Sequence, residues 1–199
     1  MAPLPYPRLP CEIVAPLADG REVCLRTIRP SDEARIRAGI DAMSDRSRYL
    51  RFFSAFRTPP DSMVKRLSAV DGHDHIGWGA ILLDGDSNPP IAAAHAIRSD
   101  DEPGVGELAV AVLDDYQGLG LARMVIAAML ADCCDEGLET LDMHVLAENR
   151  PAIALAMALG AVPVPSGATV GRYRINARAA LDQLAIDPNP GLAAVLAQL

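Results

Sequence analysis

The chain has 199 residues, of which 50% are hydrophobic and 22% are charged, and its formal net charge is −8. This composition is typical of a globular domain and excludes a largely disordered chain. The acidic balance argues against nucleic acid as a partner, because phosphate contacts need clustered Lys and Arg. It favours a cationic ligand such as an amine.

The ends of the chain differ from its middle in composition. Residues 1–18 start with a proline-rich stretch and are expected to form an N-terminal arm, followed by a single domain over 19–177. Residues 178–199 are expected to form a C-terminal helical extension, used in packing or in a subunit contact such as a homodimer. No apolar run approaches the roughly 20 residues of a membrane span, and the N-terminus lacks the apolar core of a signal peptide. We therefore expect a cytoplasmic protein without membrane contact.

Periodicity and turn signals predict an α+β order of elements with a mixed sheet. In chain order these are strands at 12–16 and 21–28, helices at 31–43, 46–53 and 61–69, strands at 76–83, 91–98 and 106–113, a helix at 119–136, a strand at 140–146, a helix from 151 to about 159, strands at 161–164 and 171–176, and two short helical pieces in 177–199.

The helix predicted at 46–53 brings aromatic residues and cations together in the sequence SRYLRFF. We interpret Leu50 and Phe53 as packing on the sheet. Tyr49 and Arg48 are interpreted as able to reach a substrate cleft.

The sequence DGHDH, from Asp71 to His75, collects two histidines and two aspartates before a predicted strand. Such a cluster invites a metal interpretation. Because the rest of the sequence suggests no third ligand, we expect a solvated loop or a cleft wall, and no metal. On that interpretation Asp71 and His75 join Tyr49 as candidate substrate residues.

The rest of the chain is organised around residues 106–122, GELAVAVLDDYQGLGLA. A buried strand leads into a glycine-rich turn and a helix, an arrangement in which free N–H groups favour an anion, typically phosphate. A dinucleotide-binding fingerprint would need a glycine at position 123, where this chain has Arg123. The Lys-Ser/Thr pair of a P-loop is also absent. The alternative to a phosphate-binding turn is that the glycines serve only the packing of the strand against the helix.

One pattern remains after these exclusions: Gln117, Gly120 and Ala122 follow a strand that carries Glu107. This pattern resembles the pyrophosphate-binding motif of the GNAT superfamily of N-acetyltransferases. The order of elements is similar to the GNAT fold, in which a central, mixed, mostly antiparallel twisted sheet is flanked by helices. The segments DGREVCLRTIRPSD and MSDRSRYLRFF resemble bacterial protein-lysine acetyltransferases in particular. The matches cover residues 19–176, and we expect no fused regulatory domain in 199 residues.

The resemblance implies acetyl-CoA as cofactor, a cationic primary amine as partner and Glu107 as general base. Glu107 is the ionisable residue of the central strand, and burial beside apolar neighbours is expected to raise its pKa. A strand-end carboxylate that faces solvent is the structural alternative. The implied cofactor-binding residues are Leu108, Ala109, Val110, Val112, Gln117, Gly118, Leu119, Gly120, Leu121, Ala122 and Asn149.

The residues of the implied site have separate tasks. A backbone N–H among residues 108–110 is expected to meet the oxyanion, residues 110–112 to pair with the pantetheine arm, and residues 117–122 to hold the diphosphate. Asn149 is expected near the leaving sulfur.

One position departs from the family pattern. Ala156 stands where many GNAT enzymes carry a tyrosine that protonates the leaving thiolate.

Three functions follow as hypotheses. The first is acetylation of protein lysine, and the second is acetylation of a small amine such as a polyamine, amino sugar or antibiotic. The third is a non-catalytic CoA-binding regulatory domain. Ala156 is the observation that favours the last.

Overall fold

A computed structural model of the chain describes residues 12–54, 56–85 and 87–199. Its middle layer is a sheet of eight strands in the order β1-β2-β3-β4-β5-β6-β8-β7. Neighbouring strands are antiparallel except β5 and β6, which are parallel. The strands are β1 Ile13–Pro16, β2 Glu22–Thr27, β3 His75–Leu82, β4 Pro90–Arg98, β5 Val105–Val112, β6 Thr140–Leu146, β7 Val162–Val164 and β8 Val170–Asn176. The expected mixed, mostly antiparallel sheet is confirmed.

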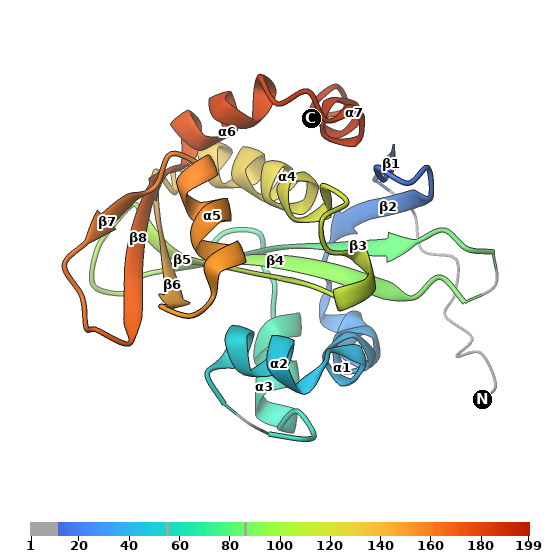
Figure 1. Cartoon of the computed structure of the whole chain (residues 1–199), viewed down its shortest axis with the longest axis horizontal. Coiled ribbons are helices and arrows are strands. Elements are labelled where there is room, and N and C mark those ends of the chain that lie inside the picture. The colour runs from blue at the N-terminus through green and yellow to red at the C-terminus, as the bar shows by residue number, and fades with distance from the viewer. Residues whose placement is uncertain (1–11, 55, 86) are drawn as a thin grey trace.

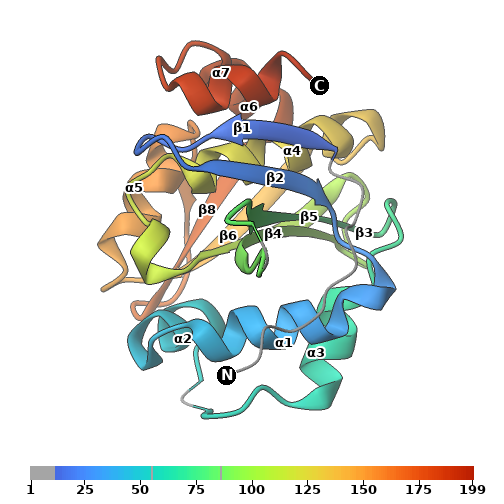
Figure 2. The ribbon, with the colours of Figure 1, turned by 90° about the vertical axis from the view of Figure 1, so that its right-hand side faces the viewer.

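Helices cover both faces of this sheet (Figures 1 and 2). Figure 1 shows α1, α2 and α3 below the sheet, α4, α6 and α7 above it, and α5 beside β6. The helices are α1 Glu33–Ala42, α2 Asp45–Phe52, α3 Asp61–Ser68, α4 Leu121–Asp135, α5 Arg150–Ala158, α6 Ala177–Ala185 and α7 Pro190–Leu196, with short 3-10 turns at Pro30–Asp32 and Asp114–Tyr116. The predicted order of helices and strands is therefore confirmed, with bounds that differ by a few residues.

The main core lies between α4 and the sheet. Residues 124–130 of α4 are all buried, because the sheet lies on one side of this helix while α6 and α7 pack on the other. Trp78 of β3 joins this core and donates its indole N–H to Asp132 at the end of α4, 2.7 Å away. The first-turn residue Leu121 is buried as well. Because α4 is anchored along its length, the turn that precedes it is anchored too.

The predicted helix at 31–43 starts later than expected, at Glu33. The reason is Asp32, whose carboxylate accepts hydrogen bonds from the Arg29 N–H and from the buried guanidinium of Arg26. These bonds hold Pro30–Asp32 in a 3-10 turn before α1 begins. Arg26 belongs to β2, in which all residues from Val23 to Arg26 are buried, so that both faces of this strand are covered.

Both ends of the described chain pack on the domain. Within the expected arm, β1 pairs with β2 and therefore belongs to the sheet, whereas residues 1–11 lie outside the described residues. In the C-terminal extension, α6 and α7 pack on α4, and α7 also contacts β1, where Gln198 donates to the carbonyl of Val14. Among the described helices, none has the length and apolar character to cross a membrane.

Candidate active site

The parallel strands β5 and β6 pair over only three residues each, Val105–Glu107 with Thr140–Asp142. Beyond Glu107, β5 stays paired with β4 as far as Val112, while β6 stays paired with β8 as far as Leu146. The two strands therefore separate. On its β6 side, β5 has backbone groups beyond Glu107 that the sheet does not use.

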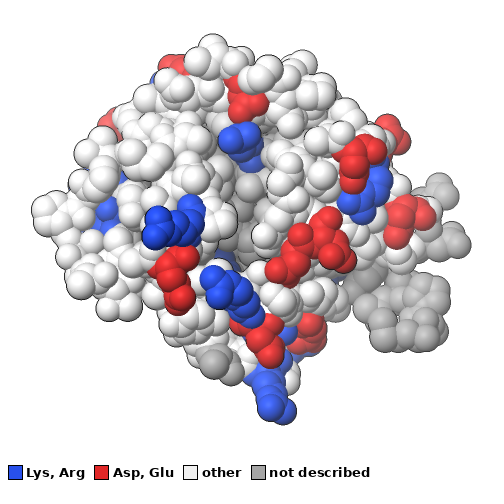
Figure 3. Space-filling model, viewed as in Figure 1, with Lys and Arg blue, Asp and Glu red and all other residues white. Residues whose placement is uncertain are grey.

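A cleft of about 600 Å³ opens where β5 and β6 separate. Figure 3 shows this face of the molecule hollowed near its centre, with cationic and anionic side chains around the hollow. The charged residues that line the cleft are Arg46, Arg51, Glu107, Asp114, Arg123 and Glu148. The two signs of charge are balanced there, although the whole chain is acidic.

The glycine-rich turn closes one end of the cleft. Gly118 and Gly120 have φ of 76° and 87°, a region that L side chains rarely adopt. The carbonyl of Gly120 accepts the N–H groups of Arg123 and Met124, which are the first hydrogen bonds of α4. The N–H groups just before them are those that a helix start leaves free, and they suit an anion.

Most of the expected cofactor-binding residues line this cleft. They are Leu108, Ala109, Val110, Val112, Gln117, Gly118, Gly120, Leu121, Ala122 and Asn149. The exception is Leu119, which packs against the core, with its carbonyl accepting the Ala18 N–H. Gln117 also has a structural contact, because its side chain donates to the carbonyl of Val112 at 3.2 Å.

Asn149 forms the N-cap of α5 and lines the cleft beside it. Its carboxamide oxygen accepts the Ala152 N–H at 3.3 Å, so the amide nitrogen is the group that remains to serve a ligand. Ala156, about two helical turns after Asn149, is fully buried. This position of α5 therefore faces the core and supplies no acid to the cleft.

Glu107 lies at the point where β5 and β6 separate, and it lines the cleft. Its expected burial is wrong: the residue is exposed, because its side chain lies on the face of β5 that borders the cleft, although its backbone is still paired with Asp142 of β6. The neighbouring Leu108 is buried on the opposite face, against α4. Glu107 therefore points toward the side of the sheet that α2 covers.

Sequence reasoning missed Arg51, which lies in the last turn of α2 and lines the cleft. Burial lowers the pKa of its guanidinium to about 10, while the negative charge of Glu107 acts in the opposite direction. Arg51 is thus a cation at neutral pH, within electrostatic reach of the carboxylate. Two further cleft residues were missed, Arg123 after the glycine turn and the exposed His144 on β6.

The interpretation of the SRYLRFF segment is reversed in two places. Arg48 does not reach the cleft, because it is buried and donates to the carbonyls of Met43 and Ile40 beneath α2. Phe53 does not pack on the sheet but is exposed and lines the cleft. Tyr49 is exposed but does not line it.

Asp71 and His75 also lie apart from the cleft. The Asp71 carboxylate accepts the N–H groups of His73 and His75, both at 2.9 Å, and so shapes the loop before β3. His75 is buried, and its Nε2 is 2.9 Å from Nδ1 of His95 on β4. Burial lowers the pKa of both rings, and for His95 the charge of Arg51 adds to the effect, so the pair is neutral at pH 7.

No group of three or more His, Cys, Asp or Glu in residues 12–54, 56–85 and 87–199 is placed to hold a metal ion.

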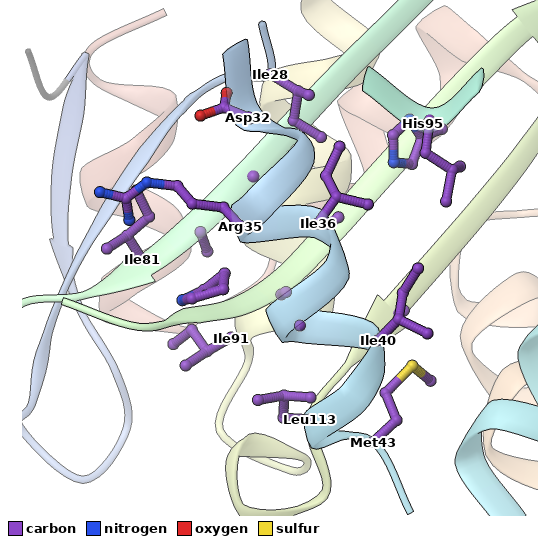
Figure 4. A pocket seen from close by; sticks show the side chains of 18 of the residues that line it. Ile28, Asp32, Arg35, Ile36, Ile40, Met43, Ile81, Ile91, His95 and Leu113 are labelled. Atoms are coloured by element: carbon purple, nitrogen blue, oxygen red, sulfur yellow. The ribbon is translucent and has the colours of Figure 1, made fainter. Parts of the chain in front are cut away.

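A second, smaller cavity of about 90 Å³ lies between α1 and the sheet. Figure 4 shows Ile36 and Ile40 on α1 to one side of it and Ile91 of β4 to the other. Its lining is mostly apolar. Three residues line both this cavity and the cleft and form the boundary between the two, Met43, Arg51 and Ala111.

Comparison with known proteins agrees with this geometry. Residues 41–161, more than half of the chain, match the acetyltransferase (GNAT) family, and the chain belongs to that family. Acetyltransferase Pat of Mycolicibacterium smegmatis is 31% identical over 138 residues, which are 69% of this chain and 40% of that relative. The chain thus spans less than half the length of this curated relative.

Two solved structures share the fold. The GNAT domain of S. lividans PAT matches with a TM-score of 0.74 and 24% identity over 82% of this chain and 95% of that one. Spermidine N-acetyltransferase from Vibrio cholerae, in complex with CoA and spermine, matches with a TM-score of 0.62 and 17% identity over 80% and 98%. By class, this chain contains an acetyltransferase domain of the GNAT family, and it is similar to the bacterial acetyltransferase Pat.

The residues of the cleft fit acetyl-CoA. The glycine turn offers N–H groups to a diphosphate, and Arg123 beside it supplies a positive charge. The unpaired side of residues 108–112 offers backbone groups to a pantetheine arm along the separated edge of β5. When bound there, acetyl-CoA supplies an activated acetyl thioester.

Proposed function

We propose that this chain transfers an acetyl group to a primary amine, with protein lysine as the acceptor and Glu107 as the general base. The observation that carries the proposal is the position of Glu107, an exposed carboxylate in the cleft at the point where β5 and β6 separate. An amine acceptor is a cation at neutral pH and must lose a proton before it can attack a thioester. A carboxylate at this point is placed to receive that proton.

The backbone of β5 complements the carboxylate. N–H groups among residues 108–110 lie on the strand beside Glu107, where sheet pairing on the β6 side has ended. Such donors stabilise the negative charge that develops on a carbonyl oxygen under attack. Asn149 adds a side-chain N–H from the opposite wall, at the start of α5.

Protein lysine is proposed because of the similarity to Pat proteins and the openness of the cleft. The cleft opens on a broad face of the molecule, and its lining combines arginines with carboxylates (Figure 3). The exposed Phe53 at the end of α2 adds apolar surface to it. A lysine side chain on another protein is long enough to enter such a cleft while its backbone stays outside.

The acceptor is tested by measuring thiol release from acetyl-CoA with lysine peptides, spermidine and an amino sugar. Turnover restricted to the small amines would favour the small-molecule alternative, for which the shared fold with a spermidine N-acetyltransferase is an argument. Acetyl-CoA binding without turnover on any amine would contradict catalysis and favour a regulatory domain.

The base is tested with Glu107→Gln, which keeps the shape and removes the charge. We expect kcat/KM for the best amine to fall by roughly a hundredfold or more at pH 7.5, with unchanged acetyl-CoA binding. Glu148→Gln is the matched control, because Glu148 is another exposed carboxylate of the same cleft. An unchanged rate for Glu107→Gln between about pH 6 and 9 would show that Glu107 is not the base.

A further inference from the structure

Phe53 ends α2 in a strained conformation. Its φ of 55° and ψ of 24° lie in the left-handed region, where the β-carbon of an L residue is crowded. Helices commonly end with glycine or asparagine in this conformation. Among the described residues, Asn88 is the other non-glycine with positive φ, and asparagine tolerates it well. Phe53 is therefore the bulky residue that is held this way.

Neither packing nor backbone hydrogen bonding explains a phenyl ring at this position. Phe53 as a residue is 43% exposed, whereas the adjacent Phe52 makes the aromatic contact, with its ring 5.4 Å from that of Phe56. The Phe53 N–H donates to the carbonyl of Tyr49 at 2.8 Å, a bond that any residue type makes. Glycine would provide the same helix end without the strain. Backbone strain of this kind is concentrated at functional sites.

Phe53 lines the cleft that Glu107 also lines. Both are on the α2 side of the sheet, and Arg51, two residues before Phe53, is close enough to Glu107 for their charges to interact. An apolar ring combined with a carboxylate matches a ligand that carries a cation on an aliphatic stem. The methylenes pack on the ring, and the ammonium group turns to the carboxylate.

We propose that Phe53 determines acceptor specificity: its ring, held in the cleft by the strained end of α2, packs against the aliphatic stem that carries the acceptor amine. This inference rests on the proposed function and assigns Phe53 to one side of the site where the acceptor amine binds. The residues of the same cleft that fit acetyl-CoA come from other elements, namely β5, the glycine turn with the start of α4, and α5. The fold bears the cost of the strain at Phe53 in the absence of substrate, and the ring contributes to substrate binding in return.

The test compares wild type with Phe53→Gly and Phe53→Asn, which suit the left-handed backbone but lack the ring. We expect an unchanged or higher melting temperature, an acetyl-CoA Kd within about twofold of wild type, and a KM for lysine peptide raised about tenfold. Peptides with ornithine or diaminobutyric acid in place of lysine should show progressively smaller losses, because a shorter stem has less contact with the ring. Phe53→Trp, which restores an aromatic surface, should retain the low KM.

Asn88→Gly is the matched control, because it relieves the other positive φ at a residue that does not line the cleft, and it should leave every kinetic constant unchanged. Three results would overturn the inference. The first is a large fall in the melting temperature of Phe53→Gly, of the size seen when a core residue is truncated. The others are an unchanged KM for lysine peptide and a loss that affects acetyl-CoA binding alone. If the wild type turns over no amine at all, the proposed function fails first, and this inference fails with it. Normal turnover by Phe53→Gly refutes this inference alone.

Discussion

Asn189 of the C-terminal extension lies directly against Gly120 of the glycine turn. A β-carbon on Gly120 would come within 2.6 Å of the Asn189 side-chain nitrogen. Asn189 cannot move freely, because its oxygen caps α7 by accepting the Leu192 N–H at 3.0 Å. The extension is therefore part of the support of the cofactor turn.

This contact predicts that Gly120→Ala is more harmful than Gly118→Ala. Both positions have positive φ, and alanine costs about 1 kcal/mol or more for that reason alone. Only at Gly120 does the new methyl group meet a neighbour, so loss of the α7 cap should add about 1 kcal/mol. Urea unfolding measures the difference. Equal losses for the two variants would show that Asn189 gives way without cost.

The same extension restrains Arg123. Asp187 lies 3.4 Å from its guanidinium and also accepts the Asn189 N–H. Asp187→Asn keeps that backbone bond but removes the charge that competes with a bound phosphate. We expect acetyl-CoA to bind about two- to fivefold more tightly at low ionic strength and the gain to fade at high salt. The double variant with Arg123→Gln should show no gain, and weaker binding by Asp187→Asn would contradict the prediction.

The buried pair of Arg26 and Asp32 should be sensitive to removal of one partner. Two hydrogen bonds of 2.9 and 2.6 Å join them, and both side chains are almost fully buried. Asp32→Leu leaves the Arg26 cation without its partner and should lower the free energy of unfolding by about 3–5 kcal/mol. The double variant Arg26→Met with Asp32→Leu should recover much of this loss. Denaturant unfolding of the two variants measures both effects.

The ionised carboxylate of Asp142 should make the stability of the fold sensitive to acid. Burial alone would raise its pKa, but hydrogen bonds from Arg174 and Arg172 outweigh this and lower the pKa to about 2. A pKa below the unfolded value means stabilisation that is complete above about pH 4 and lost as the pH falls toward 2. The contribution at pH 7 is about 2 kcal/mol, and Asp142→Asn should remove it.

The urea stability of Asp142→Asn should therefore differ from wild type at pH 7 and converge with it near pH 2. Asp61→Asn is the control, since Asp61 forms an exposed ion pair with Arg37 and should change stability by less than about 1 kcal/mol. A constant difference between Asp142→Asn and wild type at every pH would contradict the assignment.

The sequence alone determined the elements and the cofactor turn of this protein. Apolar periodicity, helix starts and glycine positions are local properties, so the strand at 106–113, the turn at 117–120 and the helix after it were predicted correctly within a few residues. Of the cofactor-binding residues that the family pattern implied, all but Leu119 line the cleft, and Leu119 packs against the core.

Only the tertiary structure decided which polar and aromatic side chains face the cleft. Arg48 and Phe53 are five residues apart on one short helix, and their burial depends on what lies beneath each of them, which no local pattern encodes. His75 is buried because its partner His95 comes from the next strand. Glu107 is the last residue of β5 that pairs with β6, and it lines the cleft that opens beyond this pair, which depends on pairing between segments far apart in the chain. Local chemistry thus fixed the elements, and long-range pairing fixed the environment of each catalytic and binding group.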